Sequence, residues 1–233
     1  MGIDLTHPAH WPAPAAHIHA VVFDCDGVLV DSERITNGVI AEMLREQGLD
    51  IDTEGSMRLF MGKTVRELLP EIEQMTGRPL PQTWYPEFLV RRDEGLRDRV
   101  ERVPGIEQVV AYLKTHSMPY AVASGADRPK MHLTLGKCGL LELFEPVMFG
   151  RDMVNHGKPA PDVYLLAMQT LDVDPARTIV IEDTPTGTAA GIAAGATVLG
   201  YAGTGNHEAL RNAGASQVFD DMLGLPDILT AIA

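Results

Sequence analysis

The sequence predicts an α/β protein, with a parallel β-sheet that carries helices on both faces and is interrupted near its start by an all-helical segment. Short apolar runs alternate with stretches of helical periodicity over residues 102–233, and this alternation is typical of a parallel sheet. Residues 35–100 show helical periodicity with no convincing strand. The sheet is therefore expected to be divided between the two flanking parts of the chain.

The first strand is expected at residues 20–23, whose four apolar side chains suit a strand buried on both faces. Asp24 and Asp26 follow it, with Gly27 directly after them, and open α/β sheets bind their ligands at such strand ends. Two carboxylates there can hold a hard cation such as Mg²⁺, and an aspartate can also act as a nucleophile. By itself, the short run Asp-Cys-Asp-Gly also fits an ordinary polar turn.

Three helices are expected in the interrupting segment. Apolar residues recur at helical spacing from Glu33 to Gln47, over residues 65–77 and over residues 82–99. Gly48 fits the C-terminal end of the first of these helices. Because this stretch lies between a strand and further α/β sequence, residues 35–100 are interpreted as a small separate bundle.

Strands and helices alternate in the second half of the chain. Further strands are expected at residues 120–123, 147–149, 178–181, 196–199 and 217–219. Helices are expected at residues 106–113, 127–137 and 161–170. A further helix is expected after Asp183, with Thr184 as its N-cap and Pro185 at its first position. The connections between these strands are long enough to hold a helix, as parallel pairing requires.

Polar residues with a chemical use follow several of these strands. Ser124 and Gly125 offer a hydroxyl and main-chain N–H groups to an anion, although a serine in a turn has the same appearance. Lys158 lies in the run Gly-Lys-Pro-Ala-Pro-Asp, where two prolines stiffen the loop and can aim the ammonium as a fixed point charge. Glu182 and Asp183 place two acids at another strand end.

The four motifs together resemble those of the haloacid dehalogenase superfamily, in its phosphatase and phosphomutase branch. The first motif of that family reads Asp-x-Asp-Gly-(Val/Thr)-Leu-(Val/Ile)-Asp-Ser, and residues 24–32 match it throughout. Ser124, the run at 158–162 and the acidic pair at 182–183 match the second, third and fourth motifs in the required order. The resemblance covers the chain from about Ala20 onward and implies a Rossmann-like parallel-sheet core with an inserted all-helical cap domain.

The resemblance implies a role for each core motif. Asp24 would attack phosphorus and form an aspartyl-phosphate, and Asp26 would act as general acid and base. Mg²⁺ would be held by Asp24, the main-chain carbonyl of Asp26 and Asp183, with Glu182 nearby. The phosphate group would be bound by Ser124, Gly125 and Lys158.

The resemblance also implies a domain organisation. The expected parts are a flexible leader over residues 1–18, a core over 19–34 and 101–233, and a helical cap over 35–100. In the family, a cap loop touches the part of the substrate beyond the phosphate, which makes Lys63 and Arg66 candidates for binding it. The same two residues also fit the description of solvated surface cations.

Composition and charge limit the partners. The formal net charge of −13 disfavours nucleic acid and anionic membranes, and no stretch approaches the roughly 18 apolar residues of a membrane span. Cys25 and Cys138 show neither metal-ligand spacing nor a disulfide framework, which is typical of a reducing cytoplasm. We expect a monomeric cytoplasmic protein whose partner is a small phosphorylated metabolite.

The sequence fits three functions. The first is a Mg²⁺-dependent phosphatase acting on a sugar phosphate or sugar-acid phosphate, because residues 24–27 and the run Pro-Lys-Met at 129–131 are similar to phosphatases of the 6-phosphogluconate phosphatase type. The second is a mutase like β-phosphoglucomutase, which carries a histidine twelve residues after its nucleophile, where this chain has Thr36. The third is a catalytically silent binding module.

Overall fold

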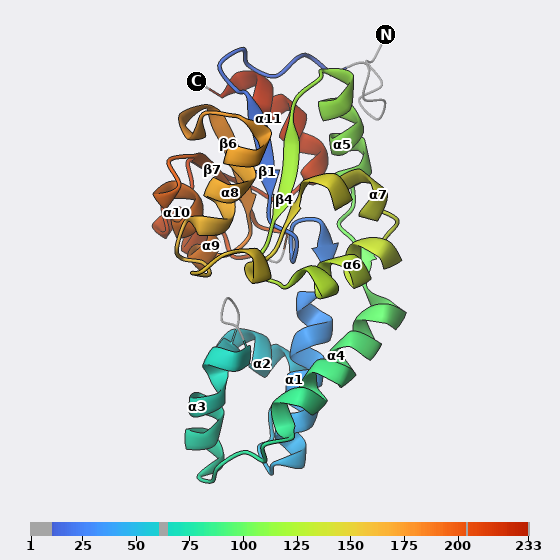
Figure 1. The fold of residues 1–233 in the computed structure, drawn as a ribbon. Coiled ribbons are helices and arrows are strands. Elements are labelled where there is room, and N and C mark those ends of the chain that lie inside the picture. Colours follow the sequence, from blue (N-terminus) through green and yellow to red (C-terminus); the bar gives the residue numbers. More distant parts are fainter. Residues whose placement is uncertain (1–10, 61–64, 204, 233) are drawn as a thin grey trace. The chain divides into compact units, whose positions relative to one another are not determined.

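The computed structural model describes residues 11–60, 65–203 and 205–232 (Figure 1). The chain forms two compact units, Met1–Val30 with Arg102–Ala233, here called the core unit, and Asp31–Glu101, here called the helical unit. The chain passes between them at β2 (Val30–Asp31) and β3 (Glu101–Arg102), which pair with each other.

The core unit contains a sheet of six strands among the described residues, in the order β5-β4-β1-β6-β7-β8, and every neighbouring pair is parallel (Figure 1). The strands are β1 (Ala20–Phe23), β4 (Tyr120–Ala123), β5 (Met148–Phe149), β6 (Thr178–Glu182), β7 (Thr197–Tyr201) and β8 (Gln217–Phe219). All residues of β1 and β6 are buried, because helices cover both faces of the sheet. The predicted α/β fold with a parallel sheet is confirmed.

Helices of the core unit connect these strands. They are α5 (Ile106–Thr115), α6 (Arg128–Lys137), α7 (Leu141–Phe144), α8 (Asp162–Leu171), α9 (Pro185–Ala193), α10 (His207–Asn212) and α11 (Leu225–Ala231), with 3₁₀ turns at Glu145–Val147, Arg151–Met153, Pro175–Arg177 and Met222–Gly224. The predicted helices correspond to α5, α6, α8 and α9. The sequence did not reveal α7, α10 and α11, because helices of four to seven residues are too short to show a period.

The helical unit consists of α1 (Glu33–Glu46), α2 (Thr53–Phe60), α3 (Val65–Thr76) and α4 (Trp84–Arg99). Its own apolar core is formed by Val39, Ile40, Met43, Leu44, Phe60, Leu68, Ile72, Trp84 and Phe88. Helices α1, α3 and α4 were predicted. The short α2 was not, and a buried hydrogen bond of 2.9 Å from Ser56 Oγ to Asn37 Oδ1 joins it to α1.

Part of the expected leader packs on the core unit. Trp11 is buried and lies edge-on against the ring of Tyr112, whose hydroxyl donates a hydrogen bond of 3.0 Å to the carbonyl of Pro12. The Ala15 amide donates to the carbonyl of Leu229 in α11 at 2.8 Å. Residues 11–18 are therefore held by apolar burial and hydrogen bonds, in contrast to the expected flexible leader, whose first ten residues lie outside the described part of the chain.

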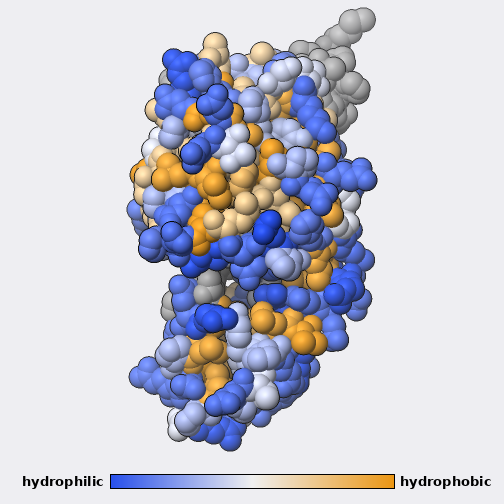
Figure 2. All heavy atoms as spheres, in the orientation of Figure 1, coloured by the Kyte–Doolittle hydropathy of each residue, from blue (hydrophilic) through white to orange (hydrophobic). Residues whose placement is uncertain are grey.

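Hydrophilic side chains are spread over both units on the face shown in Figure 2, and hydrophobic ones form only small patches there. Among the described helices, none has both the length and the apolar character needed to cross a bilayer.

Candidate active site

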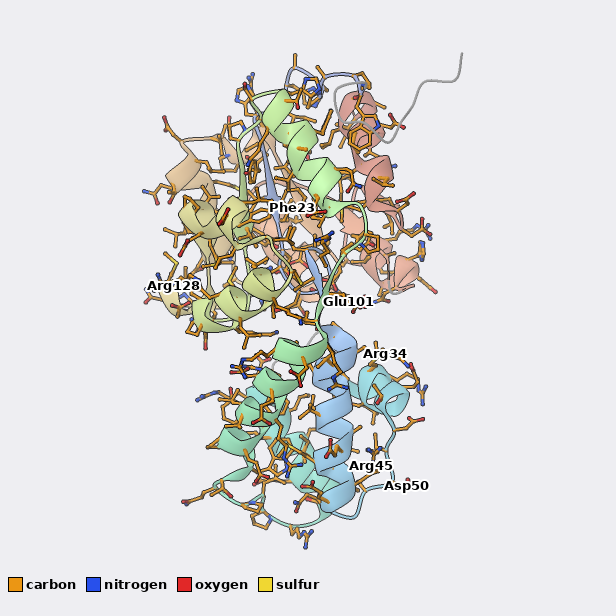
Figure 3. The ribbon with its side chains drawn as sticks, turned by 90° about the vertical axis from the view of Figure 1, so that its right-hand side faces the viewer. Phe23, Arg34, Arg45, Asp50, Glu101 and Arg128 are labelled. Atoms are coloured by element: carbon orange, nitrogen blue, oxygen red, sulfur yellow. The ribbon has the colours of Figure 1, made fainter. Side chains whose placement is uncertain are left out.

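Three adjacent strands end in predicted site residues. Asp24 follows β1, Ser124 follows β4 on one side, and Glu182 ends β6 on the other. Phe23, the last residue of β1, pairs in register with Ile181 and lies inside the core unit (Figure 3). The Asp24 amide donates to the Ile181 carbonyl at 2.9 Å, so the two acidic strand ends are held side by side. Parallel pairing thus brings together motifs that are far apart in sequence.

Lys158 reaches these strand ends from a loop that holds two prolines. Its ammonium nitrogen lies 2.5 Å from Asp24 Oδ1, 2.6 Å from Glu182 Oε1 and 3.1 Å from the carbonyl oxygen of Ala123. Burial lowers the pKa of this lysine, but the carboxylates of Asp24 and Glu182 outweigh burial and raise it overall. Lys158 is therefore a buried, positively charged group placed directly against the predicted nucleophile.

The Asp24 carboxyl lies in an acidic environment. Burial, together with the nearby carboxylates of Glu182 and Asp26, raises the pKa of Asp24 to about 7. The Lys158 ammonium lowers this pKa but does not cancel the increase. The charged form of Asp24 needs further positive charge nearby to be fully stabilised.

Asp26 has a partner that sequence reasoning missed. Lys130 of α6 places its ammonium 2.9 Å from Asp26 Oδ1, and both side chains are largely buried. The start of α6 is held by Asp152, which accepts hydrogen bonds from the amide of Arg128 at 3.0 Å and from its Nε at 2.9 Å. Lys130 was noted in the sequence only for its similarity to related phosphatases, and no local signal predicts this ion pair across 104 residues.

Glu182 braces the loop that follows β6. Its Oε2 accepts hydrogen bonds from the amides of Asp183 and Thr184 at 3.1 and 3.2 Å and from the Thr184 hydroxyl at 3.1 Å. The first turn of α9 lies directly against it, since a Cβ added at Gly187 would be 1.7 Å from Glu182 Oε1. Glu182 thus connects Lys158 to the N-terminus of α9.

Tyr164 of α8 is a second residue that sequence reasoning missed. Its side chain is fully buried, its hydroxyl donates to Glu182 Oε1 at 2.6 Å, and it accepts a hydrogen bond from the Lys158 ammonium at 2.7 Å. It follows the third motif closely in sequence, but an aromatic residue in an amphipathic helix is ordinarily a core residue.

Ser124 and Gly125 lie where the strand β4 ends. The Ser124 amide donates to the Phe149 carbonyl at 2.9 Å, and its hydroxyl accepts a hydrogen bond of 3.0 Å from the Ala126 amide. No described atom lies within 4 Å of a Cβ added at Gly125, so the protein itself leaves space at this position.

Asp183 lies against the loop of the first motif. A Cβ added at Gly27 would be 1.9 Å from Asp183 Oδ2, and Gly27 has a φ of 81°, so both space and backbone conformation require glycine there. This close approach brings the fourth motif to the residues that follow β1.

The predicted metal ligands fit Mg²⁺ by their chemistry. They are two carboxylates, from Asp24 and Asp183, and the main-chain carbonyl of Asp26, all of them hard oxygen donors. The described residues contain no group of three His, Cys, Asp or Glu side chains with metal-binding geometry, and the predicted set, with two side chains and one carbonyl, is not such a group. Burial and the carboxylates of Glu182 and Asp26 raise the pKa of Asp24, and a bound cation would stabilise its charged form.

The two cap candidates are not brought to these residues by any contact that the structure describes. Lys63 lies outside the described residues. Arg66 is exposed on α3, and its guanidinium carbon lies 4.9 Å from the ring centre of Tyr85 within the helical unit.

Comparison with known proteins identifies the family. Residues 21–201 match the family described as haloacid dehalogenase-like hydrolase. The chain belongs to this family, as the four motifs predicted. The relatives described next are hydrolases and phosphatases of this kind.

Two curated relatives and one solved structure illustrate this. The chain is 31% identical over 185 residues to the bifunctional riboflavin kinase/FMN phosphatase of Arabidopsis thaliana, covering 77% of this chain but 47% of that protein, or about half its length. It is 31% identical over 183 residues to the 6-phosphogluconate phosphatase of Escherichia coli K12, covering 78% of this chain and 82% of the relative. A haloacid dehalogenase family hydrolase of Deinococcus radiodurans R1, solved with bound phosphate and sodium, has a TM-score of 0.78 and 33% identity, covering 94% of this chain and 100% of that one.

Proposed function

We propose that the chain is a Mg²⁺-dependent phosphatase that hydrolyses a small phosphorylated metabolite through an aspartyl-phosphate on Asp24. The observation that carries this proposal is the buried pair of Asp24 and Lys158 at the ends of the central strands, 2.5 Å apart. A carboxylate nucleophile and a fixed cation in a site shielded from water are the two groups that attack on a phosphate monoester requires.

Asp24 is the nucleophile in this proposal. One carboxylate oxygen forms a bond to phosphorus while the bond from phosphorus to the leaving oxygen breaks, and water then hydrolyses the acyl phosphate and regenerates Asp24. The buried position of Asp24 removes competing solvent from the attacking oxygen.

Charge neutralisation is the second requirement, because an anionic nucleophile is repelled by an anionic phosphate. Mg²⁺, held by Asp24, the carbonyl of Asp26 and Asp183, would supply positive charge to the phosphoryl oxygens when bound. Lys158 supplies a further charge, and the Ser124 hydroxyl and the Gly125 amide would bind a phosphoryl oxygen.

Asp26 is proposed as the general acid and base. It would protonate the leaving oxygen in the first step and take a proton from the attacking water in the second. Lys130 lies 2.9 Å from Asp26 Oδ1 and holds this carboxyl group in place. A halide leaving group needs no proton, so the presence of Asp26 argues for a phosphatase and against a dehalogenase.

The proposed substrate class is a sugar phosphate or a sugar-acid phosphate. The E. coli relative is a 6-phosphogluconate phosphatase, and this supports a polar, partly anionic leaving group. The helical unit is proposed to act as the cap that closes over the site, with Lys63 and Arg66 as the cations that contact the substrate beyond its phosphate.

A phosphomutase is the second candidate, because its site would use the same core motifs. The chain has Thr36 where the β-phosphoglucomutase pattern places a histidine, and this residue favours hydrolysis over phosphoryl transfer between sugars. A silent binding module is the third candidate, and the close packing of Asp24, Lys158 and Glu182 argues against it.

A panel assay tests the proposal and separates the candidates. Phosphate release with Mg²⁺ is measured on sugar phosphates, sugar-acid phosphates and an aryl phosphate, beside interconversion of sugar 1- and 6-phosphates. We expect phosphate release, fastest on a sugar or sugar-acid phosphate, with none in Asp24→Asn. Asp220→Asn makes the same change at an exposed carboxylate and is expected to match the parent. Interconversion without net phosphate release would support the mutase, and inactivity on every substrate would support the binding module.

A further inference from the structure

We propose that Tyr164 is a positioning residue that holds the Lys158 ammonium in the place from which it contacts the phosphoryl group. This inference rests on the proposed phosphatase function. It is carried by the contacts of the buried Tyr164 hydroxyl, which lies between Lys158 at 2.7 Å and Glu182 Oε1 at 2.6 Å. The Lys158 ammonium also lies 4.4 Å from the centre of the Tyr164 ring.

The direction of these hydrogen bonds follows from the partners. An ionised carboxylate only accepts and an ammonium only donates, so the Tyr164 hydroxyl donates to Glu182 and presents its lone pair to Lys158. The hydroxyl therefore contacts both charged groups, which also contact each other at 2.6 Å. Because burial strongly raises the pKa of this phenol, it remains a neutral hydroxyl beside both charges.

A lysine side chain needs neighbouring groups that hold its ammonium in one place. Its ammonium sits on a flexible four-carbon stem, and a misplaced charge loses much of its effect on a reacting phosphate. Of the acceptors around Lys158, Asp24 is the proposed nucleophile and changes charge during the reaction. Glu182 Oε1, the Tyr164 hydroxyl and the Ala123 carbonyl do not take part in bond making, so they can hold the ammonium throughout.

The position of Tyr164 is itself fixed by packing. It lies in α8 within a buried cluster that also contains Val22, Ala123, Val163 and Val180. Two of these residues belong to the strands β1 and β4, whose ends carry Asp24 and Ser124. The hydroxyl is therefore rigid relative to the strand ends, which a side chain on a surface loop would not be.

A purely structural role is the alternative, and Tyr112 provides a matched control. Both tyrosines are fully buried, and the Tyr112 hydroxyl donates to the Pro12 carbonyl at 3.0 Å, with no described contact to a site residue. Tyr164→Phe and Tyr112→Phe each remove one hydroxyl and keep the ring. A structural role predicts a similar decrease in melting temperature and no change in kinetics for either variant.

The experiment measures melting temperature, kcat, KM and the inhibition constant of inorganic phosphate with Mg²⁺ present. We expect Tyr164→Phe to lower kcat/KM about tenfold or more. The factor should be the same for aryl and sugar phosphates, because Lys158 would contact the phosphoryl group that all these substrates share. The inhibition constant of phosphate should rise. Tyr112→Phe should match the parent in every kinetic constant.

A double substitution distinguishes action through Lys158 from a general loss of structure. In a Lys158→Met background, Tyr164→Phe should cause no further loss of phosphate binding or rate. A further loss by the same factor, or parent-like kinetics for the folded Tyr164→Phe variant alone, would overturn the inference while leaving the phosphatase proposal standing. If the parent releases no phosphate from any substrate, the phosphatase proposal fails and this inference fails with it.

Discussion

The Asp24 carboxylate and the Lys158 ammonium lie 2.5 Å apart although 134 residues separate them in the chain. Only 9% of each side chain is exposed, so burial of the two charges depends on their pairing. Lys158 also pairs with Glu182 Oε1 at 2.6 Å, so the ammonium keeps a charged partner when the Asp24 charge is removed. The pair therefore stabilises the strand ends and, in the proposed mechanism, supplies the nucleophile and a positive charge beside it.

Asp24→Asn is expected to abolish turnover and leave the fold intact, because it removes the attacking anionic oxygen and keeps the shape of the side chain. The covalent step can be observed directly by quenching the parent during turnover and measuring its intact mass. A fraction of the parent should carry one added phosphoryl group, labile to hydroxylamine, and Asp24→Asn should carry none. Phosphate release by a clean Asp24→Asn preparation would contradict the covalent mechanism.

Metal removal is expected to stop phosphate release, and added Mg²⁺ should restore it, since the predicted ligands are all hard oxygens. Metal binding can also be followed without turnover. Mg²⁺ should raise the melting temperature of the chelator-treated parent, and of Asp183→Asn much less, because that variant lacks one of the two carboxylate ligands. Full activity after exhaustive chelation would rule out a required metal.

Gly187→Ala is expected to lower stability, in contrast to the usual effect of alanine in a helix. The added Cβ would lie 1.7 Å from Glu182 Oε1, and such overpacking costs about 1–3 kcal/mol. Activity should fall too, because a displaced Glu182 no longer braces Lys158. In the control Gly136→Ala, the nearest atom would be 3.8 Å away, so a gain of about 0.5–1 kcal/mol is expected. Denaturant unfolding of both variants measures these changes, and equal effects would contradict the role of this contact.

Arg66→Ala and Lys63→Ala are expected to raise KM for the best sugar phosphate, with a smaller effect on an aryl phosphate and little change in kcat. The loss of one charge-assisted contact costs about 1.5–3 kcal/mol, or about tenfold and more in affinity. Arg92→Ala is the matched control, because Arg92 also lies over an aromatic ring in the helical unit, that of Phe88. If both variants behave like this control on every substrate, the two residues do not bind substrate.

The sequence alone could predict the parallel sheet and most of the candidate site residues at the ends of its strands. Apolar runs at 20–23, 120–123 and 178–181 predicted strands, and residues that directly follow parallel strands share one edge of the sheet. Asp24, Ser124 and Glu182 could therefore be placed together without coordinates. The four-motif order then indicated the family, and long helices such as α1 and α4 were visible from their periodicity.

Other features depended on the tertiary structure. The Lys130–Asp26 pair and the Tyr164 hydroxyl bonds arise where the helices α6 and α8 pack against the strand ends, and no local pattern encodes that contact. The sequence also did not predict the helix α2 or the packing of Trp11 on Tyr112. A short helix and an isolated aromatic residue are stabilised by residues that are distant in the sequence. A repeating pattern along the chain determines which strands and helices form, whereas the side chains that meet between them are decided by long-range packing.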